Sequence, residues 1–163
     1  MAHPGRPRKC DPKVEALGYN IRQGDFTTAR STLQLFGIDA TDGEARTALI
    51  NTVIENKLDF VQWLLENGAN VNHQDRIGYS ALYFAVQEKF IGIIKYLLQK
   101  GADPNLKNIY GNTPFMEAVH YSFVEPDMVN LLLKEGADPD IVNNAGVSPR
   151  DLYKTIHEKE LEV

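Results

Sequence analysis

Cysteine is almost absent from this sequence, since Cys10 is the single cysteine among 163 residues. No disulfide can therefore form within the chain, and no cysteine-based zinc site can be assembled. The first ten residues lack the apolar segment of a signal peptide. A run of about 18 apolar residues, which a membrane-spanning helix needs, is also missing. These absences predict a cytoplasmic protein with no membrane association.

Catalytic and metal-binding motifs are missing as well. The sequence contains no Gly-rich phosphate loop, no His-Glu-x-x-His and no nucleophile elbow. The paired acids Asp138 and Asp140 are better explained as turn residues than as catalytic carboxylates. The histidines are scattered and are interpreted as ordinary surface or loop residues: His3, His73, His120 and His157. We therefore predict no enzyme activity, no small-molecule substrate, no cofactor and no metal.

Charge is unevenly distributed. The chain carries a formal net charge of -5, but residues 1–13 are +3, which leaves -8 for the other 150 residues. An acidic body has no general attraction for nucleic acid or anionic membranes. The basic stretch from Gly5 to Lys9 resembles the Gly-Arg-Pro core of an AT-hook, which binds the minor groove of DNA. A single short hook is a weak signal, so we favour a disordered basic arm over residues 1–11 or an arm that docks on an acidic partner, with nucleic-acid binding as the lesser alternative.

Two motifs recur with one period. The pattern Leu-Leu-x-x-Gly-Ala-[Asn/Asp]-x-Asn begins at Leu64, returns 33 residues later at Leu97, and returns 35 residues after that at Leu132 with Asp140 in its last position. A second motif, Gly-x-[Ser/Thr]-[Ala/Pro], keeps the same intervals and begins at Gly78, Gly111 and Gly146. Such a period is the signature of a repeat architecture.

Each repeat predicts a pair of helices. A hydroxyl residue is placed to cap the first helix: Thr47, Ser80, Thr113 and Ser148. Apolar residues with helical spacing, such as Ile94, Leu97 and Leu98, mark the buried stripe of the second helix. A glycine then ends that helix in each repeat: Gly68, Gly101 and Gly136. The following segments, rich in Asn, Asp, Pro and Gly, are predicted to form hairpin-like extensions that we call fingers.

The repeats define a single predicted domain over residues 12–163 that follows the arm. It contains an N-terminal cap over 12–41, three repeats and a C-terminal cap over 143–163. The repeats span 42–74, 75–107 and 108–142. The third repeat has two extra residues near Tyr121 to Asp127, where Pro126 is suited to open the second helix.

The repeated residues resemble a known family. Gly111-Asn112-Thr113-Pro114-Phe115, followed by Leu131 to Asp138, is similar to the ankyrin-repeat consensus, and the resemblance covers about residues 42–152. It implies an all-α solenoid of helix pairs linked by β-turn or hairpin-like fingers. One position departs from the family, which often has a histidine two residues after the proline. This chain has Ile50, Tyr83, Met116 and Asp151 there.

The resemblance also implies a binding surface, made of the finger tips and the inner face of the first helices. Aromatic residues and Arg, which binding hot spots favour, occur at these positions, and Tyr79, Tyr110 and Tyr121 are the leading candidates. The predicted partner-binding residues are Glu44, Arg46, Glu55, Arg76, Ile77, Tyr79, Gln87, Glu88, Ile109, Tyr110, Asn112, His120 and Tyr121. Some of these side chains could instead pack against the adjacent finger.

The predicted function is protein binding by a chain that is monomeric when free. The small size and the phrases Gly-Asn-Thr-Pro and Asn-Asn-Ala-Gly-Val-Ser-Pro look similar to bacterial ankyrin proteins that neutralise secreted toxins. An acidic body would complement a basic toxin or effector domain. The alternative is a general scaffold or regulatory adaptor.

Overall fold

The computed structural model describes residues 10–123, 125–158 and 161. Within these ranges it contains ten α-helices and two isolated β-bridges but no strand, which confirms the predicted all-α fold. His3 and the AT-hook-like stretch from Gly5 to Lys9 lie outside the described residues. The chain forms two compact units, Met1–Asn70 and Val71–Val163, and each is described here by itself.

The first unit contains five helices. They are α1 (Pro12–Glu15), α2 (Leu17–Gln23), α3 (Phe26–Phe36), α4 (Ala48–Ile54) and α5 (Leu58–Glu66). The side chain of Asp11 accepts a hydrogen bond from the first turn of α1, and the thiol of Cys10 donates one to the carbonyl of Thr41 over 3.0 Å. The helices α2 and α4 pack side by side. Ile21 on α2 and Val53 on α4 are fully buried.

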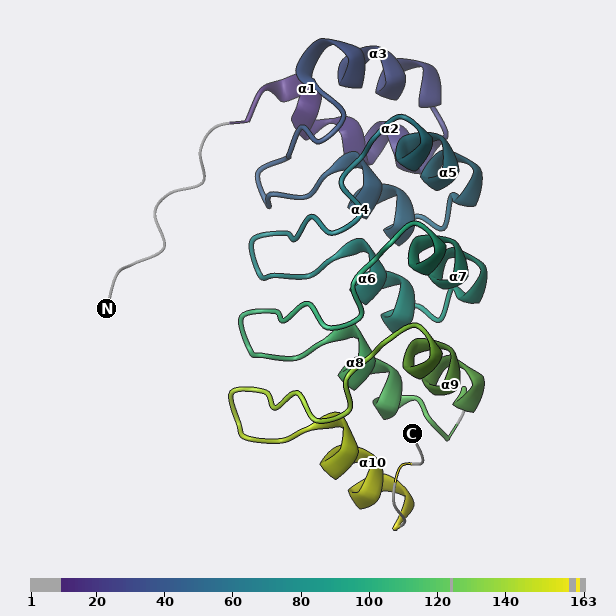
Figure 1. Cartoon of the computed structure of the whole chain (residues 1–163). Helices are drawn as coiled ribbons and strands as arrows, with labels where there is room; N and C mark the ends of the chain where they lie inside the picture. The colour runs from purple at the N-terminus through teal and green to yellow at the C-terminus, as the bar shows by residue number, and fades with distance from the viewer. Residues whose placement is uncertain (1–9, 124, 159–160, 162–163) are drawn as a thin grey trace, which may run out of the picture. The chain divides into compact units, whose positions relative to one another are not determined.

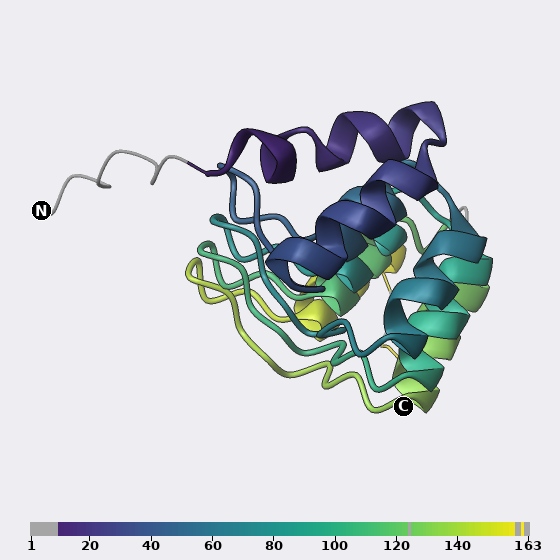
Figure 2. The same cartoon turned by 90° about the horizontal axis from the view of Figure 1, so that it is seen from above.

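The second unit also contains five helices. They are α6 (Ala81–Gln87), α7 (Ile91–Gln99), α8 (Pro114–His120), α9 (Pro126–Lys134) and α10 (Pro149–His157). The first helices of successive repeats, α6, α8 and α10, pack on one another in a row, while α7 and α9 pair with α6 and α8 (Figure 1). Figure 2 shows that the fingers of this unit leave the side away from α7 and α9.

Local sequence explains why these helices begin and end where they do. The predicted caps are confirmed in every repeat, because each hydroxyl accepts a hydrogen bond from an amide in the first turn, as Ser80 does from Tyr83 over 3.2 Å. Helix α9 begins at Pro126, so the two extra residues lengthen a loop without shifting the core. Leu97 and Leu132 are fully buried, as the apolar stripe predicts.

Hydrogen bonds tie the fingers of the second unit together. We define them as finger 1 (71–79), finger 2 (104–112) and finger 3 (139–147). The amide of Ile109 donates to the carbonyl of Ile77 over 2.9 Å, and the amide of Asn144 donates to the carbonyl of Tyr110 over 3.0 Å. The side chain of Asn144 also donates to the carbonyl of Ile109 over 2.9 Å. The fingers are therefore one connected layer and not three independent loops.

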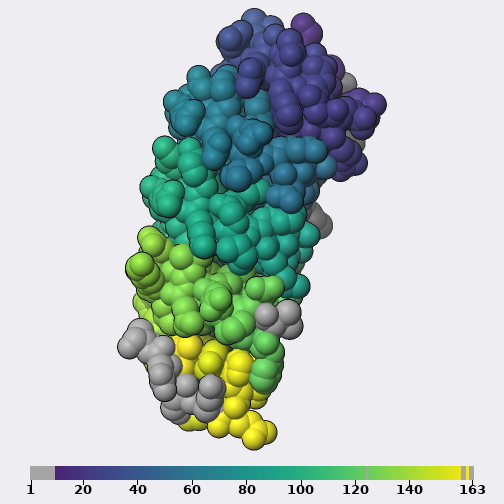
Figure 3. Space-filling view, turned by 90° about the vertical axis from the view of Figure 1, so that its right-hand side faces the viewer, coloured from purple at the N-terminus to yellow at the C-terminus, as the bar shows by residue number. Residues whose placement is uncertain are grey.

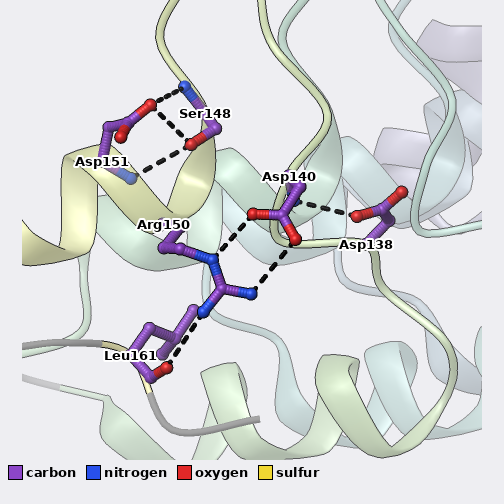
Figure 4. A network of polar contacts seen from close by, with 6 residues as sticks. All are labelled: Asp138, Asp140, Ser148, Arg150, Asp151 and Leu161. Atoms are coloured by element: carbon purple, nitrogen blue, oxygen red, sulfur yellow. Dashed lines mark hydrogen bonds and ion pairs between the residues drawn. The ribbon is translucent and has the colours of Figure 1, made fainter.

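A polar network closes the C-terminal end of the second unit (Figure 4). Ser148 and Asp151 form a capping box at the start of α10, so the aspartate that replaces the family's histidine has a local role. The guanidinium of Arg150 binds both carboxylate oxygens of Asp140, over 2.7 and 3.1 Å, and donates to the carbonyl of Leu161 over 3.2 Å. The side chain of Leu161 is buried.

The interpretation of His157 as an ordinary surface residue is wrong. Its ring contacts those of Phe123 and Tyr153, with a centroid distance of 4.1 Å to each. Its Nε2 atom lies 2.6 Å from the hydroxyl oxygen of the buried Ser122. Because Ser122 follows α8 and His157 ends α10, these contacts connect the last helix to the loop before α9.

Candidate functional site

In the first unit, the predicted site residues are partly engaged within the fold. The carboxylate of Asp42 accepts hydrogen bonds from the amides of Glu44 and Arg46, each over 2.9 Å, and so shapes the turn that presents them. Glu55 forms an ion pair with Arg22 over 2.8 Å. Because Arg22 offsets its charge, Glu55 contributes less to an acidic surface than the sequence suggests.

In the second unit, the tips of the fingers are apolar and exposed. Ile109 is 57% exposed and Tyr110 is 55% exposed, and both lie on finger 2. Val142 and Val147 are exposed on finger 3. Ile77 is half-buried, whereas Arg76 is exposed beside it. Asn112 has a structural role, because its side-chain oxygen Oδ1 accepts a hydrogen bond from Nδ2 of Asn143 over 2.9 Å.

Tyr79 is more enclosed than its place on a finger predicts. Its ring lies 4.4 Å from that of Tyr83 and 5.6 Å from that of Phe84, measured between centroids. Tyr79 therefore packs in part against its neighbours, the alternative that the sequence left open for some of these side chains. The physical reason is the large, buried ring of Tyr83. It occupies the position where the family often has histidine, and it packs against the ring of Tyr79.

Two residues that sequence reasoning missed complete this region. Tyr83 is only 6% exposed, and its hydroxyl donates a hydrogen bond to the carboxylate of Glu117 over 2.8 Å. Tyr121, a predicted site residue, is half-buried next to the same carboxylate. We call Tyr79, Tyr83, Glu117 and Tyr121 the tyrosine–glutamate cluster.

The ends of the first helices add charged and polar groups around the cluster. Gln87 and Glu88 are exposed at the C-terminal end of α6, and His120 is exposed at the end of α8. The ammonium of Lys89 lies 4.2 Å from the centroid of the Tyr121 ring. The ring face of Tyr121 thus already accommodates one cation.

The environment of the cluster keeps its tyrosines protonated. Burial, followed by the hydrogen bond and the negative charge of Glu117, raises the pKa of Tyr83 far above its ordinary value. Burial first and the charge of Glu117 second raise the pKa of Tyr121. Burial also raises the pKa of Tyr79, with neighbouring Tyr110 and Glu117 adding to the effect. At neutral pH the Tyr83 hydroxyl that donates to the Glu117 carboxylate is therefore uncharged.

These shifts predict a loss of stability in alkali. Above pH about 10 an unfolded tyrosine ionises, whereas folded Tyr83 stays protonated, so the unfolded state binds fewer protons and stability falls as pH rises. We expect the free energy of unfolding, measured by urea denaturation, to fall less between pH about 8 and 11 in Tyr83→Phe than in the wild type. Tyr96→Phe, on α7 outside the cluster, is the matched control. Equal falls in Tyr83→Phe and the wild type would contradict this assignment.

The helices α7 and α9 lie on the side of the second unit away from the fingers (Figure 2), and that side faces the viewer in Figure 3. Lys95 lies exposed on α7 and away from the fingers, so it serves as a control position.

Within residues 10–123, 125–158 and 161, no group of three His, Cys, Asp or Glu side chains is placed to hold a metal ion. None of the helices in those ranges is long and apolar enough to cross a membrane.

Comparisons with known proteins agree with the repeat architecture. A family model for three copies of the ankyrin repeat matches residues 17–108, and a model for a single ankyrin repeat matches residues 110–144. The ankyrin repeat domain-containing protein OPG015 of monkeypox virus is 45% identical over 49 residues, which are 30% of this chain and 11% of the viral protein. Ankyrin repeats are in general non-enzymatic protein interaction modules. The matched models cover most of the sequence, and the chain therefore belongs to the ankyrin-repeat family.

Proposed function

We propose that this protein binds a partner protein through its fingers and the adjoining ends of its first helices. The observation that carries the proposal is the apolar tip of finger 2, where Ile109 and Tyr110 are both more than half exposed. Main-chain hydrogen bonds to fingers 1 and 3 hold this tip in place, so little conformational entropy would be lost on binding. Exposed aromatic side chains on a preorganised backbone are favourable binding anchors.

The partner-binding residues proposed from the sequence fall into two groups on the structure. Glu44, Arg46 and Glu55 belong to the first unit. The second unit carries Arg76, Ile77, Tyr79, Gln87, Glu88, Ile109, Tyr110, Asn112, His120 and Tyr121. The second group supports the proposal better, because it combines exposed apolar tips with the tyrosine–glutamate cluster. We further propose that binding is the whole activity, without catalysis or a cofactor, and that the free protein is a cytoplasmic monomer.

Two kinds of partner follow from this proposal. One is a basic toxin or effector domain that the protein neutralises, and the other is a client of a scaffold or adaptor. The exposed carboxylate of Glu88 supports a basic partner, whereas Glu55 supports it less because Arg22 pairs with it. Once a partner is purified, its activity is assayed with and without this protein. A toxin or effector that is neutralised should lose activity in proportion to the amount of complex formed, whereas a partner of a scaffold or adaptor should not.

Site-directed photo-crosslinking tests where the partner binds. A benzophenone amino acid replaces Tyr110 on finger 2 in one variant and Lys95 on α7 in the other. After illumination in an extract of the native host, we expect a discrete adduct from position 110 and none from position 95. Equal melting temperatures of the two variants serve as the folding control. An adduct from position 95 alone would move the site to the outer helices, and no adduct from either would contradict the proposed function.

A further inference from the structure

We propose that the tyrosine–glutamate cluster of the second unit anchors an arginine side chain carried by an extended segment of the partner. This inference rests on the proposed function and deepens it, because it names the chemical group that the partner must present. The guanidinium would bind the carboxylate of Glu117 and lie against the rings of Tyr79 and Tyr121.

The carboxylate of Glu117 has unused binding capacity. Its Oε2 atom accepts the hydroxyl of Tyr83 over 2.8 Å. A carboxylate offers about four lone-pair sites, so acceptor sites remain after the Tyr83 hydroxyl is bound. No Lys, Arg or His among the described residues forms an ion pair with Glu117, although the side chain is half-buried. A half-buried carboxylate that accepts from a neutral donor binds most strongly a cation that donates two parallel hydrogen bonds to its two oxygens.

The tyrosine rings around this carboxylate suit a flat cation. Lys89 places its ammonium 4.2 Å from the centroid of the Tyr121 ring, which shows that a positive charge can occupy this face. Tyr79 and Tyr83 lie with their centroids 4.4 Å apart and form an aromatic wall on α6 and finger 1. A planar guanidinium can stack on such rings while its N–H groups bind a carboxylate, whereas an ammonium can do only one of these well.

Charges near the cluster favour a cation over an anion. Besides Glu117, the exposed Glu88 is close enough to contribute to the raised pKa of Tyr121. Lys89 is exposed just after α6, and its ammonium lies against the ring of Tyr121. The carboxylates of Glu117 and Glu88 beside the ammonium of Lys89 would repel a phosphorylated or acidic peptide and attract a basic one.

A buried amide beside the cluster lacks an acceptor. Asn108 is 6% exposed, and its Nδ2 atom has no hydrogen-bond partner among the residues that the structure describes. One repeat later, the equivalent Asn143 donates to Asn112 and to the sulfur of Met116. The residues equivalent to Asn112 and Met116 are here Tyr79 and Tyr83, so the acceptors that serve Asn143 are missing for Asn108. A main-chain carbonyl of the bound segment would supply the missing acceptor.

Short peptides test the chemistry directly on the full chain. The probes are blocked pentapeptides of glycine with a central arginine, citrulline or lysine, and the readout is the shift of tyrosine ring signals by nuclear magnetic resonance. Citrulline keeps the shape of arginine but is neutral. We expect the arginine peptide to bind with a Kd on the order of 1 mM, and the citrulline peptide to bind at least about tenfold more weakly. The lysine peptide should fall between them, and added salt should weaken binding of both cations.

Three substitutions connect this binding to the cluster. Glu117→Gln removes the charge and keeps an acceptor for Tyr83, so we expect at least about a tenfold loss of affinity for the arginine peptide. Lys89→Gln frees the face of Tyr121 and removes a competing charge, and should strengthen binding. Lys95→Gln, an equal change of charge on α7, should have no effect. If Glu117→Gln lowers the melting temperature, the citrulline comparison and Lys89→Gln still decide the matter on folded protein.

The outcomes separate this inference from the proposed function. Equal binding of the arginine and citrulline peptides, unchanged affinity in Glu117→Gln, or stronger binding of lysine than arginine would each overturn the arginine site. A partner adduct from position 110 would leave protein binding intact in those cases. Selective arginine binding without any adduct from position 110 would support the anchor chemistry while contradicting the proposed partner surface.

Discussion

Replacing Leu97 by alanine is expected to lower the free energy of unfolding by about 2–5 kcal/mol. Leu97 is fully buried on α7, and truncation removes apolar contacts and leaves a cavity that the helices around it can close only in part. Leu132→Ala on α9 should have an effect of the same size, because the same position recurs one repeat later and is equally buried. Chemical denaturation monitored by circular dichroism measures both.

Lys95→Ala is the control for this prediction, since Lys95 is exposed on the same helix as Leu97. Its effect should stay within about 0.5 kcal/mol. A loss below about 0.5 kcal/mol in Leu97→Ala would show that the core is misassigned. A loss in Leu97→Ala with an unchanged denaturant slope would indicate that the second unit still unfolds cooperatively.

The repeat core could be predicted from the sequence because its signals are local. A capping hydroxyl, an apolar stripe and a terminal glycine each act within one helix or its ends, and they recur in every repeat. Thr113 and Leu132 therefore occupy their expected places. The opening of α9 at Pro126 followed from the same local chemistry.

The roles of Tyr83 and Glu117 in the tyrosine–glutamate cluster were missed because the contact between them crosses from one repeat to the next. The hydroxyl of Tyr83 reaches Glu117, which is 34 residues away, and Arg22 reaches Glu55 over a separation of 33 residues. Side chains one period apart lie side by side in stacked repeats, so a search at that spacing could have paired them. The departure from histidine at Tyr83 was visible, but its consequence depends on which side chain stands in the next repeat.

His157 illustrates a second limit. Its partners, Phe123 and Ser122, lie in the loop that contains the two extra residues of the third repeat. An irregular loop has no repeat equivalent that could serve as a guide, so its contacts could not be inferred from the period. The conformation of this loop determines which of its side chains contact α10, here Ser122 and Phe123.

Replacing Gly111 by alanine is expected to destabilise the second unit more than the same change at Gly146. Both glycines have positive φ angles, 78° and 76°, so each substitution should carry a backbone strain of about 1–2 kcal/mol. At Gly111 the new Cβ atom would also lie 2.7 Å from the amide nitrogen and the side-chain oxygen of Asn144 on finger 3, whereas at Gly146 nothing lies within 4 Å. Relieving that overlap should cost about 1–3 kcal/mol more.

The pair of glycine variants also tests whether the fingers act as one layer. Separating fingers 2 and 3 would break the hydrogen bonds from Asn144 to the carbonyls of Tyr110 and Ile109. Hydrogen exchange of the Asn144 amide should therefore speed up in Gly111→Ala by more than the change in global stability explains, and should not do so in Gly146→Ala. Equal stability and equal exchange in the two variants would mean that finger 3 moves aside at no cost. The exposed tip at Ile109 and Tyr110 would then lack the rigid support on which the proposed binding surface depends.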